Sequence, residues 1–166
     1  MTFRGKKYRR ISIKIKPLIV FKHILDALDD IVLPDTEAKP QDIKYAILEM
    51  VNNSIRVHRD NDIADPLTLI FEYENTSLTI VIEDRGPGFN PEKLPYSLND
   101  DPQSVDLKSE QFTKYREQHD YKRFGMGLFL VRKTFRSFKL TFLDIDGIAV
   151  PWVEGKIHGT SIKVGI

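Results

Sequence analysis

The side chains best suited to chemistry share one face of a helix predicted for residues 41–58. Glu49 and Asn53 are four residues apart in this segment, so they stack one helical turn above the other. A carboxylate and an amide in that arrangement could act as a general base and as a metal ligand. Asn52 and Arg56 lie on the same face. Two asparagines are unusual on a purely solvated helix face, because asparagine is a weak helix former. An ordinary solvated face stays open as the alternative.

The other side of this helix must face the core of the protein, because six apolar side chains recur there at helical spacing. His58 falls near the middle of the same arc, and we expect a packed histidine there rather than a metal ligand. The six apolar residues are Ile43, Ile47, Met50, Val51, Ile55 and Val57.

A second candidate group is the segment EDRGPGFN at residues 83–90, which directly follows the apolar run LTIVI. Asp84 ends a predicted buried strand, where its carboxylate can accept a hydrogen bond from an exocyclic amine such as that of adenine. Gly86 and Gly88 carry no Cβ, so the backbone beside them can approach a flat ring closely. The alternative is a tight turn in which Asp84 caps its own backbone.

A third candidate group is the segment KRFGMGLFLVRK at residues 122–133. Gly125 and Gly127 open a helix predicted to run to Phe138, and the free N–H groups at a helix start form an anion site. Lys122 and Arg123 stand just before it, where they can add charge-assisted contacts to a phosphate. A Rossmann dinucleotide site is excluded, because the third glycine is missing and no strand precedes the segment. A Walker A sequence is also absent.

The elements that must position these groups follow from the hydrophobic pattern. We expect strands at 8–16, at 139–145 and at 159–166, a hairpin at 65–84, and helices at 17–32, 41–58 and 125–138. This order predicts an α+β fold, a two-layer sandwich with helices packed on one face of a mixed, mostly antiparallel sheet. Residues 91–124 are polar and weakly patterned, which is typical of a functional or disordered loop. The length of 166 residues predicts a single domain over 1–166.

Composition excludes several classes of function. The formal net charge is +1, from 25 basic and 24 acidic residues, so charge gives no reason to expect a nucleic-acid partner. We expect the basic residues among the first ten to form a solvated, partly frayed leader. The chain has no cysteine, which excludes disulfides and thiol catalysis. No apolar run reaches the roughly 18 residues of a membrane span, and no signal peptide is recognisable, so we expect a cytoplasmic protein without membrane contact.

Four segments resemble, in order and spacing, the N, G1, G2 and final Gly-Thr boxes of the GHKL superfamily: LEMVNNSIRVH, EDRGPGFN, RFGMGLFLVRK and HGTSIKV. This superfamily unites gyrase, the heat-shock chaperones and histidine kinases through an ATP-binding fold, the Bergerat or histidine-kinase-like ATPase fold. The resemblance covers about residues 40–165. It implies helices on a mixed sheet, with ATP beneath a flexible lid that we assign to residues 91–124.

The resemblance also implies roles for individual residues. Asn53 is expected to hold Mg²⁺ together with the phosphates of ATP, which suits an ion that uses few protein ligands. Asp84 is expected to bind the adenine amine in a pocket shaped by Gly86 and Gly88, with Thr160 assisting through water. The expected phosphate-binding residues are those of the third segment: Lys122, Arg123, Gly125, Met126, Gly127 and Leu128.

Within the superfamily, the chain resembles the anti-sigma-factor serine/threonine kinases. Those kinases carry glutamate four residues before the metal-binding asparagine, where Glu49 stands, whereas histidine kinases usually carry asparagine. A serine hydroxyl must lose a proton when it attacks phosphorus, so Glu49 is expected to be the catalytic residue. The implied partners are ATP or ADP, a sigma factor and an antagonist protein that accepts the phosphoryl group, in a possible homodimer.

Two other functions remain open: a separate ATP-binding domain of a histidine kinase-type two-component system, and a non-catalytic, nucleotide-gated binding protein. Gyrase-type relatives need a second domain, for which we expect no room in this chain. Some features depart from the anti-sigma pattern. Arg56 stands where many histidine kinases have lysine, and His58 comes one position late. The lid is long, and residues 145–158 look like an insertion.

Overall fold

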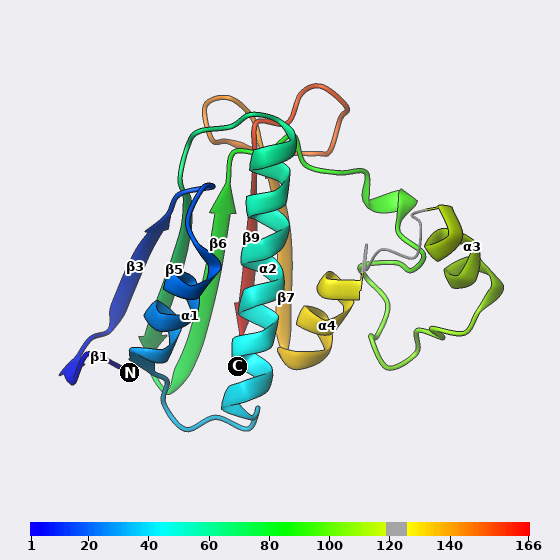
Figure 1. Ribbon diagram of the computed structural model, residues 1–166. Coiled ribbons are helices and arrows are strands. Elements are labelled where there is room, and N and C mark those ends of the chain that lie inside the picture. The colour runs from blue at the N-terminus through cyan, green and yellow to red at the C-terminus, as the bar shows by residue number, and fades with distance from the viewer. Residues whose placement is uncertain (119–125) are drawn as a thin grey trace.

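The main sheet is open and antiparallel, and helices cover one of its faces (Figure 1). The computed structural model describes residues 1–118 and 126–166. Within these residues every pair of neighbouring strands in the sheet runs antiparallel, so the predicted α+β sandwich is confirmed. From edge to edge, the strands are β3 (Arg10–Ile15), β5 (Leu67–Glu74), β6 (Ser77–Asp84), β9 (Gly159–Gly165), β7 (Ser137–Leu143) and β8 (Ala149–Val150).

The helices α1 (Phe21–Asp29), α2 (Pro40–Asp60) and α4 (Met126–Thr134) lie on the same face of this sheet (Figure 1). Successive side chains of a strand alternate between the two faces of the sheet. Residues paired across neighbouring strands therefore form rows on one face, and the rows that face the helices are mainly apolar. Leu69 pairs with Ile82 in one such row, and both side chains are buried. The next row on this face contains the polar pair Asp84 and Thr160, beside the buried Phe142. The strands therefore deliver these two side chains to the helix side of the sheet.

The central helix α2 follows the predicted pattern closely. Pro40 occupies the first turn, where its missing N–H costs no hydrogen bond. Five of the six predicted apolar-arc residues are buried, and Val57 is half-buried. His58 is fully buried, which confirms the expectation of a packed histidine. On the opposite side, Glu49 and Asn53 are half-buried, so this face is partly covered rather than fully solvated.

The N-terminal segment differs from the expectation of a frayed leader and a helix over 17–32. The helix α1 is shorter, and residues after it form the strand β4 (Ile31–Val32). This strand pairs with β1 (Thr2–Phe3), which pairs in turn with β2 (Lys6–Lys7). The physical reason is that Ile31 is buried while its backbone groups are satisfied by Phe3, a pairing too distant in sequence for local patterns to indicate.

The helix predicted for residues 125–138 also ends earlier than expected. The helix α4 stops at Thr134, and the strand β7 already includes Phe138. The backbone N–H of Arg136 donates to the carbonyl of Gly165 at 3.0 Å, and Ser137 is in register with Gly165. Pairing with the last strand therefore takes these residues out of the helix. Gly125, the expected first residue, lies outside the described residues.

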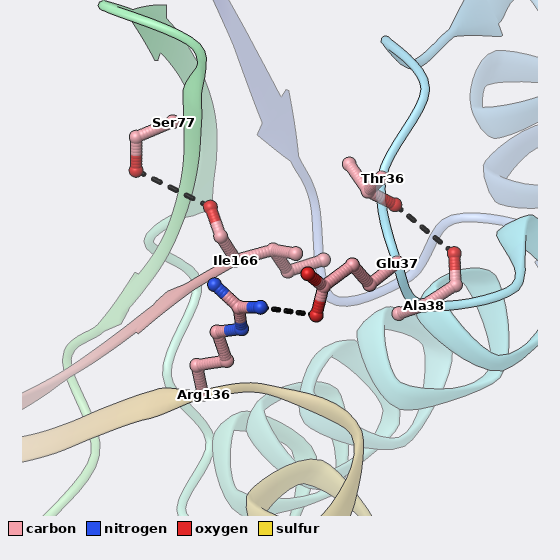
Figure 2. A network of polar contacts seen from close by, with 6 residues as sticks. All are labelled: Thr36, Glu37, Ala38, Ser77, Arg136 and Ile166. Atoms are coloured by element: carbon pink, nitrogen blue, oxygen red, sulfur yellow. Dashed lines mark hydrogen bonds and ion pairs between the residues drawn. The ribbon is translucent and has the colours of Figure 1, made fainter.

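Polar contacts also fix the end of the sheet that is remote from Asp84 (Figure 2). Arg136 forms an ion pair with Glu37, in the segment that leads into α2. The Ser77 hydroxyl donates to the carbonyl of Ile166 at 3.3 Å. The first contact ties the segment before α2 to the start of β7, and the second ties the start of β6 to the C-terminal residue, so this end of the sheet is fixed as well.

The residues between β6 and α4 form a short 3₁₀ helix, η1 (Pro91–Lys93), and the helix α3 (Glu110–Gln118), which lies beside α4 and away from the sheet (Figure 1). We call residues 91–118 the lid segment. None of the helices formed by residues 1–118 and 126–166 has the length and apolar character needed to cross a membrane.

Candidate functional site

The carboxylate of Asp84 is the centre of a buried hydrogen-bond network. Asp84 is 8% exposed. Its Oδ2 accepts from Ser54 Oγ at 2.7 Å and from Thr160 Oγ1 at 2.8 Å. Its Oδ1 accepts from the backbone N–H of Gly86 at 2.9 Å. A carboxylate has about four acceptor positions, so these three bonds leave room on Oδ1 for one further donor, such as an amine.

Ser54 was missed by the sequence analysis. It lies on the core face of α2, is 3% exposed, and reaches Asp84 from the helix while Thr160 reaches it from β9. A signal was present, because Ser54 falls inside the apolar arc of the helix and a buried hydroxyl needs a partner. The sequence alone could not show that the partner was Asp84.

The two glycines after Asp84 are required by packing inside the protein. A Cβ on Gly86 would lie 2.4 Å from Val57 Cγ1, so the corner can rest on α2 only with glycine there. Gly88 has φ +67°, and a Cβ there would lie 3.0 Å from both Ile157 and Phe142. The tight turn considered above is present, since Gly86 donates to the Asp84 side chain. It coexists with the spare acceptor position on that carboxylate.

The start of α4 rests directly on the polar pair of α2. A Cβ on Gly127 would lie 2.6 Å from Glu49 Oε2 and 3.2 Å from Asn53 Nδ2. The glycine therefore allows the two helices to meet at these side chains. Glu49 is thereby held against the first turn of a helix, where free N–H groups favour negative charge. The segments around residues 49–53 and 127, far apart in sequence, form one site.

The remaining residues predicted to bind phosphate have different positions. Leu128 is 7% exposed, and Met126 packs against the apolar side chains of the lid segment. Both therefore contribute to the interior, and their backbone belongs to the first turn of α4. Lys122, Arg123 and Gly125 lie outside the described residues.

Arg56 engages the atom that would bind a metal. Its Nη2 donates to Asn53 Oδ1 at 3.1 Å. Arg56 also lies close to Tyr115 of α3: burial raises the pKa of Tyr115, and the Arg56 cation acts against that rise. A metal ion that binds Asn53 Oδ1 would share this oxygen with the guanidinium or displace it, since an amide oxygen has two lone pairs. The guanidinium is itself well placed to contact an anionic ligand.

The side-chain oxygens of Glu49 and Asn53 suit a magnesium ion, although Asn53 turns its Nδ2 toward Gly127 and its Oδ1 toward Arg56. Asn53 and Glu49 offer an amide and a carboxylate oxygen, the hard ligands that Mg²⁺ prefers. Across residues 1–118 and 126–166, His and acidic side chains nowhere gather in the groups of three or more that a protein-only metal cage would need. Since Mg²⁺ commonly keeps several waters and binds through substrate phosphates, the Asn53 amide with a bound polyphosphate is a sufficient donor set.

The lid segment has a small apolar core of its own, which is anchored on α4. Tyr96 stacks on Phe112 with ring centroids 6.3 Å apart and meets Phe129 of α4 edge-on at 5.9 Å. Burial raises the pKa of Tyr96. Arg132 of α4, only 8% exposed, donates to the carbonyl of Ser97 at 3.1 Å and to that of Asp100. No local sequence pattern indicates these contacts.

A hollow of about 400 Å³ also touches Asp84, but it belongs to another part of the surface. Its lining includes Lys14, Thr68 and Glu83, which form a row on the sheet face opposite the helices. Lys14 Nζ donates to Thr68 Oγ1 at 2.7 Å. Since neither Glu49 nor Asn53 lines this hollow, we attach the chemistry to the helix side of Asp84.

Comparison with known proteins identifies a family for most of the chain. The family model described as histidine kinase-like ATPase domain matches residues 21–142. The match contains α2, the Asp84 corner and α4, and it ends before Thr160. A search of curated proteins found no match to the chain.

Proposed function

The chain belongs to the family of histidine kinase-like ATPase domains, and on that premise we propose that it is an ATP- and Mg²⁺-dependent serine/threonine protein kinase resembling anti-sigma factors. The observation that carries the proposal is the contact of Gly127 with both Glu49 and Asn53. It brings a candidate base and a candidate metal ligand to the helix start that is proposed to hold phosphate.

Adenine would be recognised at the buried end of the site. The Asp84 carboxylate would accept the adenine amine at the position left on Oδ1. Ser54, Thr160 and the Gly86 N–H already fix the orientation of that carboxylate, so the acceptor is aimed before the nucleotide arrives. A purine with a carbonyl in place of the amine would bring its oxygen against the carboxylate and would be rejected.

The triphosphate would extend along α2 toward Asn53 and the start of α4. When bound, Mg²⁺ neutralises charge on the phosphates and orients the transferred group. Asn53 Oδ1 would hold that ion, and Arg56, displaced from Asn53, would turn to a phosphate oxygen. We propose that Lys122, Arg123 and the N–H groups of residues 125–128 complete the phosphate contacts.

Glu49 would act on the phosphoacceptor. Its carboxylate would accept the proton of a serine or threonine hydroxyl as the oxygen forms a bond to the γ-phosphorus and the bond to ADP breaks. The products are a phosphoprotein and ADP. The resemblance to anti-sigma factors supports an antagonist protein as acceptor and a sigma factor as binding partner, with residues 1–166 acting as one cytoplasmic domain in a possible homodimer.

A second function is favoured by one observation. Arg56 places a cation three residues after Asn53, where many histidine kinases have lysine, and this supports a separate ATP-binding domain of a two-component system. The two functions differ in their product, because phosphoserine survives acid whereas phosphohistidine does not. Acid treatment of the labelled product therefore distinguishes them.

The test compares wild type, Glu49→Gln and the control Glu154→Gln, which alters an exposed glutamate in the segment between β8 and β9. Each is incubated with γ-labelled ATP, Mg²⁺ and proteins of the source lysate, and ATP affinity is measured separately by calorimetry. We expect Glu49→Gln to retain ATP affinity and to lose phosphoryl transfer by about a hundredfold or more, with the control unchanged. Undiminished transfer in Glu49→Gln eliminates Glu49 as the base, and absence of ATP binding by the wild type eliminates the function itself.

A further inference from the structure

His58 is a fully buried polar side chain that the proposed chemistry does not use. It lies on α2 one turn after Ser54, on the same core-facing side. Its Nε2 is 3.0 Å from the backbone nitrogen of Arg85, and its Nδ1 is 2.9 Å from the carbonyl oxygen of Asp65. The imidazole therefore bridges the segment that leads into β5 and the residue that follows Asp84.

The partners of the ring define its hydrogen positions. The backbone N–H of Arg85 can only donate, so Nε2 must be the unprotonated nitrogen that accepts it. The carbonyl of Asp65 can only accept, so Nδ1 must carry the hydrogen. His58 is thus a neutral imidazole in the Nδ1–H form, and both of its nitrogens are occupied.

The Arg85 N–H belongs to the peptide unit that begins at the carbonyl carbon of Asp84. Fixing this peptide limits rotation of the backbone that carries the Asp84 side chain. Two further contacts come from the same stretch of α2: Ser54 donates to the Asp84 carboxylate, and Val57 touches Gly86. The last two turns of the helix therefore hold the corner at three consecutive residues, 84, 85 and 86.

We propose that His58 is a positioning residue for purine recognition: by accepting the Arg85 N–H, it aims the spare Oδ1 acceptor of Asp84 at the amine of adenine. This inference rests on the proposed function, because it concerns which purine the same site prefers. If the inference is right, His58 affects both the stability of the fold and the preference of the site for adenine over other purines.

Two variants separate the two ends of the ring. In His58→Gln the amide oxygen can reach the position of Nε2 and still accept the Arg85 N–H. In His58→Asn the shorter amide can reach the position of Nδ1 and still donate to Asp65, but the Arg85 N–H loses its acceptor. Both variants remove the imidazole, so packing is disturbed in each, while only one removes the contact beside Asp84.

The measurement is the affinity ratio for ATP over inosine triphosphate, which carries a carbonyl in place of the amine, together with the unfolding midpoint of each variant. We expect His58→Asn to reduce this ratio by about tenfold, the order of one hydrogen bond to a charged group, and His58→Gln to keep most of it. A loss of affinity for both nucleotides in equal proportion, or equal ratios in the two variants, would overturn the proposal.

A measurement on the wild type covers the case in which His58→Asn does not fold. Nitrogen-15 spectra of the histidine rings should show an unprotonated Nε2 at His58, and the Arg85 amide should shift on addition of ATP but not of inosine triphosphate. A protonated Nε2, or an Arg85 amide that does not respond to ATP, contradicts the inference. If the wild type binds no ATP, the proposed function has failed. If the wild type binds ATP and His58→Asn discriminates between the two nucleotides as well as the wild type does, only this inference has failed.

Discussion

At the scale of single residues, the position of the Asp84 carboxylate is the most consequential feature of the site. A buried carboxylate is tolerated only when donors compensate for its lost hydration. Here the donors come from three separate segments: Ser54 on α2, Gly86 in the corner and Thr160 on β9. The same bonds that make its burial acceptable also determine which acceptor position is left for a ligand.

Ser54→Ala tests this arrangement. The substitution removes one of three donors and leaves Asp84 Oδ2 with Thr160 alone. We expect the free energy of unfolding to fall by about 1–3 kcal/mol and the affinity for ATP to weaken, because the carboxylate is less firmly oriented. Chemical denaturation and calorimetry measure the two effects.

Ser161→Ala is the matched control for Ser54→Ala. Ser161 adjoins Thr160 but is in register with Glu83 on the opposite face of the sheet, so its loss should change neither quantity appreciably. If Ser54→Ala unfolds and binds ATP as the wild type does, the Asp84 network is not what orients the carboxylate.

Sequence motifs predicted the residues of this network better than its contacts. Asp84 and Thr160 were expected near one ligand, and the strand register brings them together. Gly86 was predicted to make room for a ring, and the structure adds that the place of its Cβ is closed by Val57 of α2, a neighbour that the motif does not indicate. The difference arises because a motif records which residue types are needed at a position, while the neighbour that requires a glycine depends on how distant segments pack.

At the scale of elements, α4 connects the two halves of the site. Its first turn rests on Glu49 and Asn53 through Gly127. Its later turns hold the lid segment through Phe129 and Arg132. Because α4 contacts both the Glu49–Asn53 pair and the lid segment, we expect a shift of its first turn to reach the lid segment.

Arg132→Met tests the attachment of the lid segment. Methionine keeps much of the apolar stem but leaves the carbonyls of Ser97 and Asp100 without their donor. We expect amide hydrogen exchange in residues 91–118 to accelerate by about tenfold, the effect of losing a charged hydrogen-bond donor. The global unfolding midpoint should change little, since this cluster is separate from the main core.

The neighbouring substitution Lys133→Met is the control, because Lys133 is exposed and should leave exchange in the lid segment unchanged. Equal protection of residues 91–118 in Arg132→Met and wild type would mean that the aromatic stack alone holds the segment.

The elements that were predicted well are those with strong local periodicity, such as α2 and the hairpin of β5 and β6. The hairpin turn even carries its signal in Asn75, which adopts φ +47°, a conformation that asparagine tolerates. The sequence did not predict the helices of the lid segment, because their formation depends on contacts between Tyr96, Phe112 and α4. The small sheet of β1, β2 and β4 likewise depends on a non-local pairing.

At the scale of the whole molecule, the candidate site exists only in the folded chain. Its residues come from segments around positions 49–58, 84–88, 126–128 and 159–160, which the sheet and α2 bring together. A ligand that contacts all of these segments can bind the native state and not the unfolded one. Binding must therefore raise the free energy of unfolding according to mass action.

We accordingly expect ATP with Mg²⁺ to stabilise the chain against unfolding by about 2.7 kcal/mol at a hundredfold excess over its dissociation constant. For a chain of this length, that corresponds to a rise in the thermal midpoint of roughly 5–10 °C. Inosine triphosphate should stabilise less at the same concentration, because a carbonyl replaces the exocyclic amine that is proposed to donate to Asp84. Chelation of Mg²⁺ should reduce the effect of ATP, because Asn53 would then face the charge of the phosphates without the ion that neutralises it. Thermal unfolding monitored with each nucleotide, with and without chelator, separates these contributions. Equal stabilisation by both nucleotides would mean that the purine ring binds away from Asp84. Stabilisation by ATP that does not depend on Mg²⁺ would mean that the phosphates bind away from Asn53.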